Sequence, residues 1–345
     1  MAFHYLYSGI VNNKINSVGH IEGVVGFVKY GYLGVEFFFI ISGYVIFHSA
    51  LRGDAAAFLA ARCVRLFPAF WAAVIITSLA AQMWGTGLTA VTAPQFFANM
   101  TMFPYLFGEG YVDGVYWTLR YEWQFYLGVF LILLFVRPKR LTIFILIWPI
   151  YISANYFWLR GGLPLAGGYY AYFSAGALFA VFTVKRQWYV LAMLALSALL
   201  CLHFSLQNAA EMSLRSGREF SSIVVASAVL CMFFFFTFLQ RSGIRDLRLP
   251  GSKTAGAMSY PLYLVHAHLG FMLISNFGSE ENKILVYSCV SLLVMLIAYL
   301  IHSVVENLSK KFWKRLFKLT IHYPLDFVQS SLSKAFVLLQ SSKRI

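Results

Sequence analysis

Long apolar stretches alternate with short polar segments along most of the chain. An apolar block of about 20 residues matches a helix that crosses a bilayer core of roughly 30 Å. By this criterion the sequence predicts nine full spans. They lie near residues 32–51, 67–84, 116–136, 141–158, 168–184, 188–206, 220–240, 255–277 and 284–307. The pattern is typical of an all-α polytopic membrane protein.

The first ten residues, MAFHYLYSGI, are also rich in apolar side chains. They are too few to cross a bilayer, and they lack the basic flank of a signal peptide. We interpret them as the end of a further span whose first half lies before Met1. The expectation is therefore about ten transmembrane helices, the first of them truncated.

Composition agrees with this class of protein. Of the 345 residues, 60% are hydrophobic, 18% are aromatic and 12% are charged, which is far from the usage of a soluble domain. The four cysteines have neither disulfide nor metal spacing, so we expect no metal site. No glycine-rich phosphate loop interrupts the apolar blocks.

The distribution of basic residues predicts the orientation. Twenty of the 27 lysines and arginines fall in one set of alternate loops and the tail, and six fall in the other set. Because Lys and Arg stay on the cytoplasmic side of short loops, both termini are predicted to face the cytoplasm. The net charge of +14 is then a topology signal and an attraction to anionic lipid, and it gives no support to nucleic-acid binding.

We therefore expect the chain to consist of a transmembrane domain over residues 1–308 and a cytoplasmic tail over residues 309–345. Within the tail, KKFWKRLFKL places apolar side chains on one helical face and basic ones on the other. A helix of this kind lies in the plane of an anionic leaflet. Membrane anchoring is therefore the expected role of the tail.

Ionisable side chains at membrane depth are costly and indicate function unless a partner explains them. Three remain after the interfacial ones are set aside: His4, Glu36 and Glu122. From the rise of an α-helix, they lie about 6 to 9 Å below the outer surface, at a common level. An imidazole accepts a proton from a hydroxyl, and a carboxylate on its other nitrogen fixes the tautomer. The three side chains thus predict a catalytic site for acyl transfer to an alcohol.

Each of these residues also has an ordinary interpretation. A single histidine near a chain start is often incidental, and Glu122 could form a structural ion pair with another span. Near the inner face, Arg62 and Arg65 share one helical neighbourhood in RCVRLFPAFW, just before a membrane entry at Pro68. This pair could hold phosphates of a cytosolic ligand, or it could be ordinary basic anchoring.

Five stretches together resemble the membrane acyltransferase family 3, the integral-membrane O-acyltransferases that modify cell-envelope and secreted sugars. They are FHY at 3–5, GVEFFFIISGYVI at 34–46, RCVRLFPAFW at 62–71, YWTLRYEWQFYL at 116–127 and SYPLYLVH at 259–266. They occur in the family's order, and the resemblance runs from His4 to about Glu306. An arginine that family members carry before the first-span histidine would precede Met1.

The resemblance implies a multi-pass protein of the bacterial inner membrane that moves an acyl group, acetyl above all, from acyl-CoA to a hydroxyl of a polysaccharide or glycolipid. By similarity His4 matches the essential histidine, and Glu36 and Glu122 match two acids of the family. Arg62 and Arg65 match its basic motif. Tyr263 and His266 match a later element, in which His266 either lines a donor channel or packs through hydrogen bonds.

A transporter or flippase for a sugar or a lipid-linked glycan is the alternative class. Its buried acids would carry protons or a sugar, and no bond would be made. An imidazole paired with a carboxylate, together with an inner pair of arginines, has no evident use in transport. The sequence therefore favours an acyl-CoA-dependent O-acetyltransferase.

Overall fold

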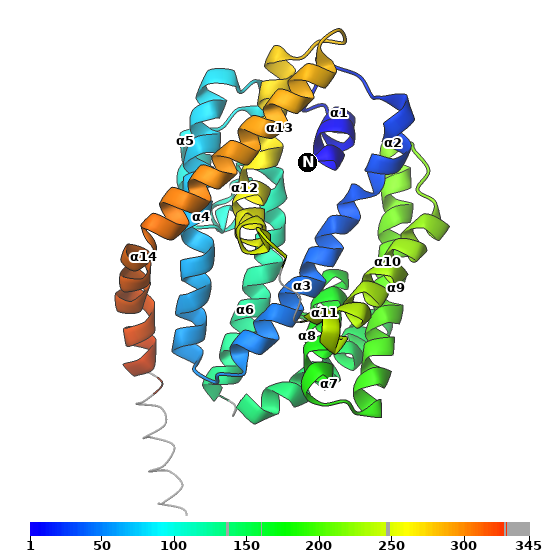
Figure 1. Ribbon diagram of the computed structural model, residues 1–345, viewed down its shortest axis with the longest axis vertical. Coiled ribbons are helices and arrows are strands. Elements are labelled where there is room, and N and C mark those ends of the chain that lie inside the picture. The colour runs from blue at the N-terminus through cyan, green and yellow to red at the C-terminus, as the bar shows by residue number, and fades with distance from the viewer. Residues whose placement is uncertain (136–137, 160, 246–248, 328, 330–345) are drawn as a thin grey trace, which may run out of the picture. The chain divides into compact units, whose positions relative to one another are not determined.

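The computed structural model describes residues 1–135, 138–159, 161–245, 249–327 and 329, and within them every regular element is a helix (Figure 1). Seven helices in this described part are long and apolar enough to cross a membrane. They are Glu22–Ala50, Ala55–Trp84, Arg140–Phe157, Trp188–Ser216, Ser222–Leu239, Ser252–Phe277 and Lys283–Leu308. The all-α polytopic class is confirmed, and the predicted count of about ten spans is not.

Two of the predicted spans fold as helices that miss this criterion for physical reasons. Helix α8, Gly168–Val184, has 17 residues, which is slightly short. Helix α6, Trp117–Phe135, is long enough, but Arg120, Glu122 and Gln124 lower the hydropathy of its first turns. The N-terminal apolar residues are helical, as η1, His4–Ser8, followed by α1, Gly9–Val11.

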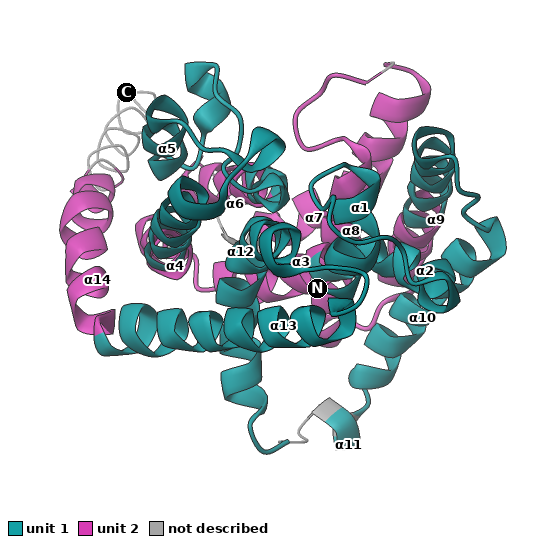
Figure 2. Ribbon diagram, turned by 90° about the horizontal axis from the view of Figure 1, so that it is seen from above, with its two compact units in different colours: residues 1–38, 68–121, 201–308 teal, residues 39–67, 122–200, 309–345 magenta. Residues whose placement is uncertain are grey.

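The chain divides into two compact units, which interleave along the sequence (Figure 2). Unit 1 consists of residues 1–38, 68–121 and 201–308, and unit 2 consists of residues 39–67, 122–200 and 309–345. The predicted boundary at residue 308 coincides with one of these limits. A division into a membrane domain and a tail stays a prediction.

Unit 1 is organised around helix α12, Ser252–Phe277. Buried side chains make up 72% of its most apolar stretch, against 17% in α10, Ser222–Leu239, so α12 is central and α10 is peripheral. The other elements that lie wholly in this unit are η1, α1, α2 (Glu22–Val28), η2 (Lys29–Tyr32), η3 (Gly87–Thr89), α5 (Ala93–Met100), η4 (Pro104–Phe107), η5 (Gly114–Tyr116), α11 (Ser242–Arg245), α13 (Lys283–Leu300) and η6 (Ile301–Leu308).

Unit 2 is organised around helix α8, whose side chains from Tyr170 to Val181 are all buried. It also holds α7 (Pro138–Phe157), α14 (Lys310–Phe317) and η7 (Lys318–His322). Helices α3 (Leu33–Ala50), α4 (Ala55–Trp84), α6 and α9 (Trp188–Ser216) each contribute one part to each unit. Where α8 crosses α3, a Cβ on Gly176 would lie 1.9 Å from the carbonyl oxygen of Ile40, and one on Gly43 would lie 2.1 Å from that of Phe173. Small residues at such crossings let two helix backbones approach, as in many membrane proteins.

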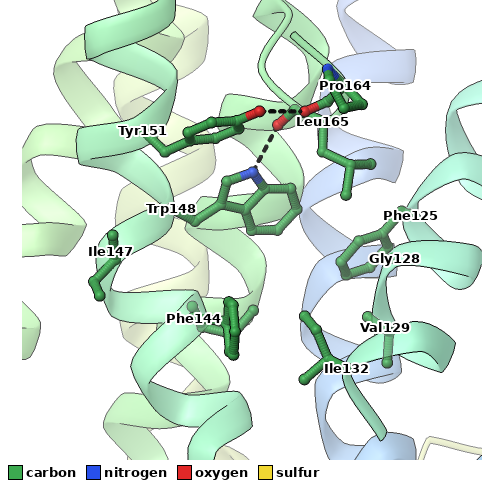
Figure 3. A pocket seen from close by; sticks show the side chains of 11 residues that line it. Phe125, Gly128, Val129, Ile132, Phe144, Ile147, Trp148, Tyr151, Pro164 and Leu165 are labelled. Atoms are coloured by element: carbon green, nitrogen blue, oxygen red, sulfur yellow. Dashed lines mark hydrogen bonds between the residues drawn. The ribbon is translucent and has the colours of Figure 1, made fainter. Parts of the chain in front are cut away.

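An apolar cavity of about 450 Å³ lies in unit 2 beside α6 and α7 (Figure 3). Its polar rim groups are turned to the loop before α8: Trp148 Nε1 donates to the carbonyl of Leu165 at 2.7 Å, and the Tyr151 hydroxyl donates to that of Pro164 at 2.9 Å. Gly128 leaves room for the Leu165 side chain, which would lie 2.5 Å from a Cβ at that position. Its described lining holds no carboxylate, imidazole, amine or thiol, and the Tyr151 hydroxyl is already bonded to Pro164.

Helix α4 begins earlier than the sequence predicted. It has 30 residues and contains Pro68, which was expected at its entry into the membrane. A helix of this length spans about 45 Å, more than a bilayer core. Arg62 and Arg65 therefore lie on a helix that extends beyond the hydrocarbon region. In the tail, the basic segment from Lys310 to Phe317 is helical as expected, and residues 328 and 330–345 lie outside the described part.

Candidate active site

His4 and His266 form a hydrogen-bonded pair inside unit 1. The Nδ1 atom of His4, on η1, lies 3.0 Å from the Nε2 atom of His266, on α12, and the two rings meet edge to face. The segments that carry them are 262 residues apart in sequence. His266 is 5% exposed and His4 is half-buried, so the contact is largely shielded from solvent.

The tautomers of the pair follow from the remaining contacts of His266. Its Nδ1 atom lies 2.9 Å from the carbonyl of Tyr263 and 3.2 Å from that of Leu262. A carbonyl only accepts, so Nδ1 carries the proton, and in the neutral ring Nε2 is an acceptor. His4 must then donate from Nδ1, which leaves a lone pair on its Nε2. That atom has no hydrogen-bond partner within the described part of the chain.

Contacts between η1 and α12 fix the position of His4. The Tyr5 hydroxyl donates to the carbonyl oxygen of His266 at 2.7 Å. Gly270 makes this possible, because a Cβ there would lie 2.2 to 2.4 Å from the Tyr5 ring and hydroxyl. Buried aromatic and aliphatic side chains then hold the surrounding turns. They are Tyr7, Val25, Tyr32, Leu33, Ala209, Phe220 and Val225.

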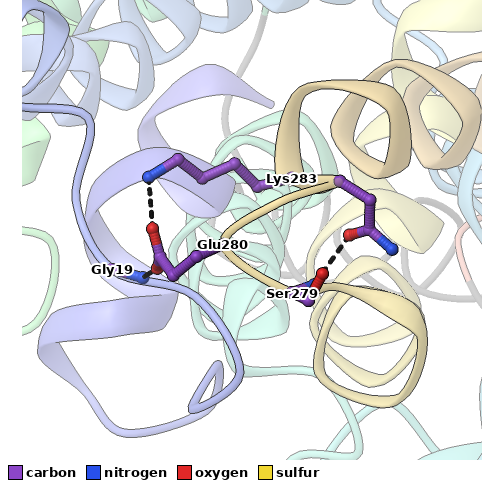
Figure 4. A network of polar contacts seen from close by, with 5 residues as sticks. Gly19, Ser279, Glu280 and Lys283 are labelled. Carbon is purple, nitrogen blue, oxygen red and sulfur yellow. Dashed lines mark hydrogen bonds and ion pairs between the residues drawn. The ribbon is translucent and has the colours of Figure 1, made fainter.

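The segment after α1 is attached to the end of α12 by backbone and side-chain bonds. Ser275 Oγ donates to the carbonyl of Lys14, and Ser17 Oγ donates to that of Ile274, both at 2.9 Å. Further along, the amide of Gly19 donates to the Glu280 carboxylate, and Lys283 pairs with the same carboxylate at 2.6 Å (Figure 4). These two hydrogen bonds lower the pKa of Glu280 below its ordinary value of 4.5, with the bond from Lys283 the larger cause.

The start of α6 is joined to the same turns of α12. The Tyr263 hydroxyl lies 2.6 Å from Thr118 Oγ1 and also donates to the carbonyl of Val115. Asp113 is fully buried and accepts from the amides of Val115 at 3.1 Å and His268 at 2.8 Å. Because a buried carboxylate needs such donors, these bonds also hold the loop before α6 against α12.

His4 borders two cavities. One, of about 300 Å³, is mainly apolar and is lined by residues that include Phe3, Gly34, Val35, Phe38, Tyr263 and His266. The other, of about 240 Å³, is more polar and is lined by residues that include Ser8, Asn12, Lys14, Asp113, Trp117 and Phe271. A base that borders two cavities can face two different reactants.

Glu36 does not join this pair. It is 2% exposed on α3, and its Oε2 accepts from the Ser205 hydroxyl on α9 at 2.7 Å. The hydrogen bond that His4 makes in the described part of the chain goes to His266. The sequence interpretation has Glu36 orienting His4, whereas this contact brings a second histidine to His4, so the orienting role of Glu36 stays a prediction.

Glu122 lies in unit 2, near the two arginines. It is 4% exposed and accepts from the Tyr126 hydroxyl at 2.6 Å and from Ser42 Oγ at 3.2 Å. The guanidinium of Arg62 lies 6.0 Å from the Tyr126 ring centroid, and the charges of Arg65 and Arg62 both act on Glu122. The second carboxylate oxygen of Glu122 has no hydrogen-bond partner within the described residues.

The structure thus groups the predicted residues differently from the sequence. His4, Tyr263 and His266 come together in unit 1, Glu36 lies elsewhere in that unit, and Glu122 gathers with the arginines in unit 2. Sequence reasoning missed Tyr5, Lys14, Asp113 and Thr118. Tyr5 and Thr118 lie within FHY and YWTLRYEWQFYL, and Asp113 shortly precedes a predicted span, but the sequence assigned none of them a role.

Comparison with known proteins identifies the family of the chain. Residues 1–303 match the family model described as an acyltransferase domain, that of acyltransferase family 3. The chain belongs to this acyltransferase family. As a family member rich in long apolar helices, it is a multi-pass membrane protein.

A curated protein similar to this chain is Nodulation protein 10 of Rhizobium leguminosarum bv. viciae. The two are 32% identical over 114 residues, which cover 27% of this chain and 31% of that protein. The aligned part of this chain thus spans about a third of the relative's length. No solved structure matches the chain significantly.

Proposed function

We propose that the protein transfers an acyl group, acetyl above all, from acyl-CoA to a hydroxyl of a cell-envelope or exported polysaccharide or glycolipid. The observation that carries this proposal is the hydrogen-bond geometry of the histidine pair, from which its tautomers follow. With Nδ1 donating to His266, the Nε2 lone pair of His4 is available to a hydroxyl. Membership of the acyltransferase family supports the reaction class.

In the proposed mechanism, His4 Nε2 takes the proton of the acceptor hydroxyl as its oxygen attacks the thioester carbonyl. A carbon–oxygen bond forms, the carbon–sulfur bond breaks, and the proton passes from His4 to the departing thiolate, which leaves as coenzyme A thiol. His266 stabilises the imidazolium through the bond at Nδ1. Holding both reactants beside one base replaces a bimolecular encounter, which supplies much of the rate gain.

Arg62 and Arg65 are assigned to the phosphates of the donor. Guanidinium groups match phosphate geometry through paired hydrogen bonds, and the two residues share one side of α4. Glu122, with its second oxygen unpartnered, positions these arginines or a donor group. Tyr263 and His266, which line the mainly apolar cavity, would border the acyl end of the donor.

The role of Glu36 stays a prediction. Its contact with Ser205 supports a function in holding α3 against α9 near the site. We further propose a bacterial inner-membrane location with both termini in the cytoplasm, on the charge distribution of the loops. The donor would then arrive from the cytoplasm and the acceptor would lie on the outer side.

The test uses the full chain, purified in lipid and incubated with radiolabelled acetyl-CoA and a mixed glycan acceptor. An acyltransferase releases free thiol and labels the glycan, whereas a transporter or flippase leaves the thioester intact. Release of thiol with equal labelling of the glycan would support the proposal. An intact thioester in the presence of every acceptor would contradict it.

A further inference from the structure

The polar cavity beside His4 holds a lysine that the mechanism above does not use. Lys14 lies in the segment after α1, and its side chain borders the cavity of about 240 Å³ together with Ser8, Asn12 and His4. The cavity therefore presents one ammonium group beside the proposed base.

Neighbouring groups hold this ammonium in place and leave its charge unpaired. Nζ lies 5.6 Å from the centroid of the Phe271 ring. A Cβ on Gly114 would lie 3.4 Å from Nζ. In the described part of the chain no carboxylate lies within ion-pair distance of Nζ. A cation over an aromatic ring keeps its attraction for an anion.

The acid that lines the same cavity does not offset this charge by direct contact. Asp113 is fully buried, and its two oxygens already accept from the amides of Val115 and His268. Asn12 is likewise occupied, because its amide group donates to Ser8 at 2.8 and 3.1 Å. Lys14 is thus the charged donor that remains for a ligand in this cavity.

We propose that the cavity takes an acceptor sugar that carries an anionic group, a carboxylate or a phosphate, next to the hydroxyl that is acylated. This inference rests on the proposed function, because it assigns the acceptor side of the same site. Lys14 would bind the anion and so hold the neighbouring hydroxyl at Nε2 of His4. A partly enclosed pair is screened by salt less than an exposed one, and charge-assisted bonds of this kind are expected to change affinity about 10- to 100-fold.

The experiment measures binding without acyl-CoA, by calorimetry on the full chain in uncharged detergent. The probes are digalacturonate, the neutral digalactose of the same linkage, and that digalactose carrying one phosphate. We expect one of the two anionic probes to bind at least about tenfold more tightly than the neutral one, and the better probe identifies the anion. The preference should shrink as salt rises.

Three variants make the test specific. Lys14→Gln should abolish the preference, Lys14→Arg should keep it, and Lys253→Gln should also keep it, because that exposed lysine at the start of α12 does not line the cavity. Equal binding of all three probes to the unmodified protein, or a preference that survives Lys14→Gln, would overturn the proposal. A preference that depends on Lys14 in a protein that leaves the thioester intact would support this site and contradict acyl transfer. Equal rates of acyl transfer to anionic and neutral sugars would support acyl transfer and contradict the anion site at Lys14.

Discussion

The two central helices, α12 of unit 1 and α8 of unit 2, are held in different ways. Around α12 the contacts are directional hydrogen bonds to named side chains, such as those of His266 with His4 and of Tyr116 with the carbonyl of Leu264 at 3.1 Å. Around α8 the decisive contacts are steric, because Gly43 and Gly176 let two backbones touch. Helix α8 carries no charged side chain.

This difference predicts which property a substitution changes first in each unit, the reaction rate or the stability of the fold. A hydrogen bond contributes about 1 kcal/mol net to stability, so losing one around α12 leaves the protein folded but changes where a proton resides. A side chain added between two touching helix backbones around α8 forces them apart. This lowers the stability of the fold, because cores tolerate little added volume. Changes in unit 1 should therefore act first on rate, and changes in unit 2 first on stability. The predictions below test that separation, beginning with the largest effect.

His4→Gln should have the largest effect on rate. General bases contribute about 10²- to 10⁴-fold, and the loss of the Nε2 lone pair should cost that factor in the rate of acyl transfer. Melting temperature should move little. The control is His20→Gln, which removes a half-buried histidine from the same segment, one that contacts the carbonyl of Leu6. Full transfer activity in His4→Gln would end the assignment of the base.

His266 should affect the transfer rate through its Nε2 atom, which accepts the hydrogen bond from His4. His266→Phe removes the atom that receives the proton of His4, and the wrong tautomer should lower the transfer rate about 100-fold. His266→Gln restores an acceptor oxygen and should recover part of that loss, which a purely structural role would not predict. The check is the rate as a function of pH for both variants. Equal rates in the two would exclude the orienting role.

Gly176→Leu should unfold unit 2 before it affects chemistry. With a Cβ already 1.9 Å from the Ile40 carbonyl, the helices must separate, and overpacking of this kind costs about 1–3 kcal/mol or more. The expected result is a lower melting temperature and a lower yield of inserted protein. Gly26→Ala is the matched control, because nothing lies within 4 Å of the added Cβ there. A Gly176→Leu variant with unchanged stability would contradict the comparison.

Gly270→Ala tests whether a steric change in unit 1 acts through the site. The added Cβ would displace the Tyr5 ring and with it η1, so the distance from His4 to His266 should grow and the rate should fall about tenfold. Adding Tyr5→Phe removes one of the clashing atoms, the hydroxyl, and should recover some activity. Transfer kinetics and melting curves of the single and double variants give the coupling between these residues. Purely additive effects would show that Gly270 does not act through Tyr5.

The sequence predicted the class of fold because membrane spans are set by local composition. Eight of the predicted apolar blocks each overlap one long helix of the structure. The ninth block, 168–184, coincides with α8, Gly168–Val184. Boundaries failed where a helix continues into polar surroundings. α4 and α9 both run past the predicted apolar stretch, because backbone hydrogen bonding does not stop at the membrane surface.

The site was predictable only in its residue types. Depth along each helix placed His4, Glu36 and Glu122 at one level, but depth contains no information on lateral position. The partner of His4 proved to be His266, 262 residues away, and the match depends on Gly270 and Tyr5, whose roles no single-residue pattern reveals. Lateral pairing is a property of helix packing, so it had to come from the structure.

The smallest effect is expected at the turn between α12 and α13, where Glu280 holds the segment that carries Lys14 (Figure 4). Since the folded protein lowers the pKa of this carboxyl below 4.5, the bond is present above that pH and is lost as pH falls through the lower folded value. Near pH 7 the attachment is complete, and lowering the pH to about 5 should not weaken it.

Glu280→Gln removes the charge at every pH, so the segment should loosen. The affinity for an anionic acceptor should then fall about two- to threefold, with transfer to a neutral acceptor unchanged. Titrations of the digalacturonate probe at pH 5 and pH 7 measure this. A loss of affinity at pH 5 in the unmodified protein, equal to that in Glu280→Gln, would show that some other group controls the segment.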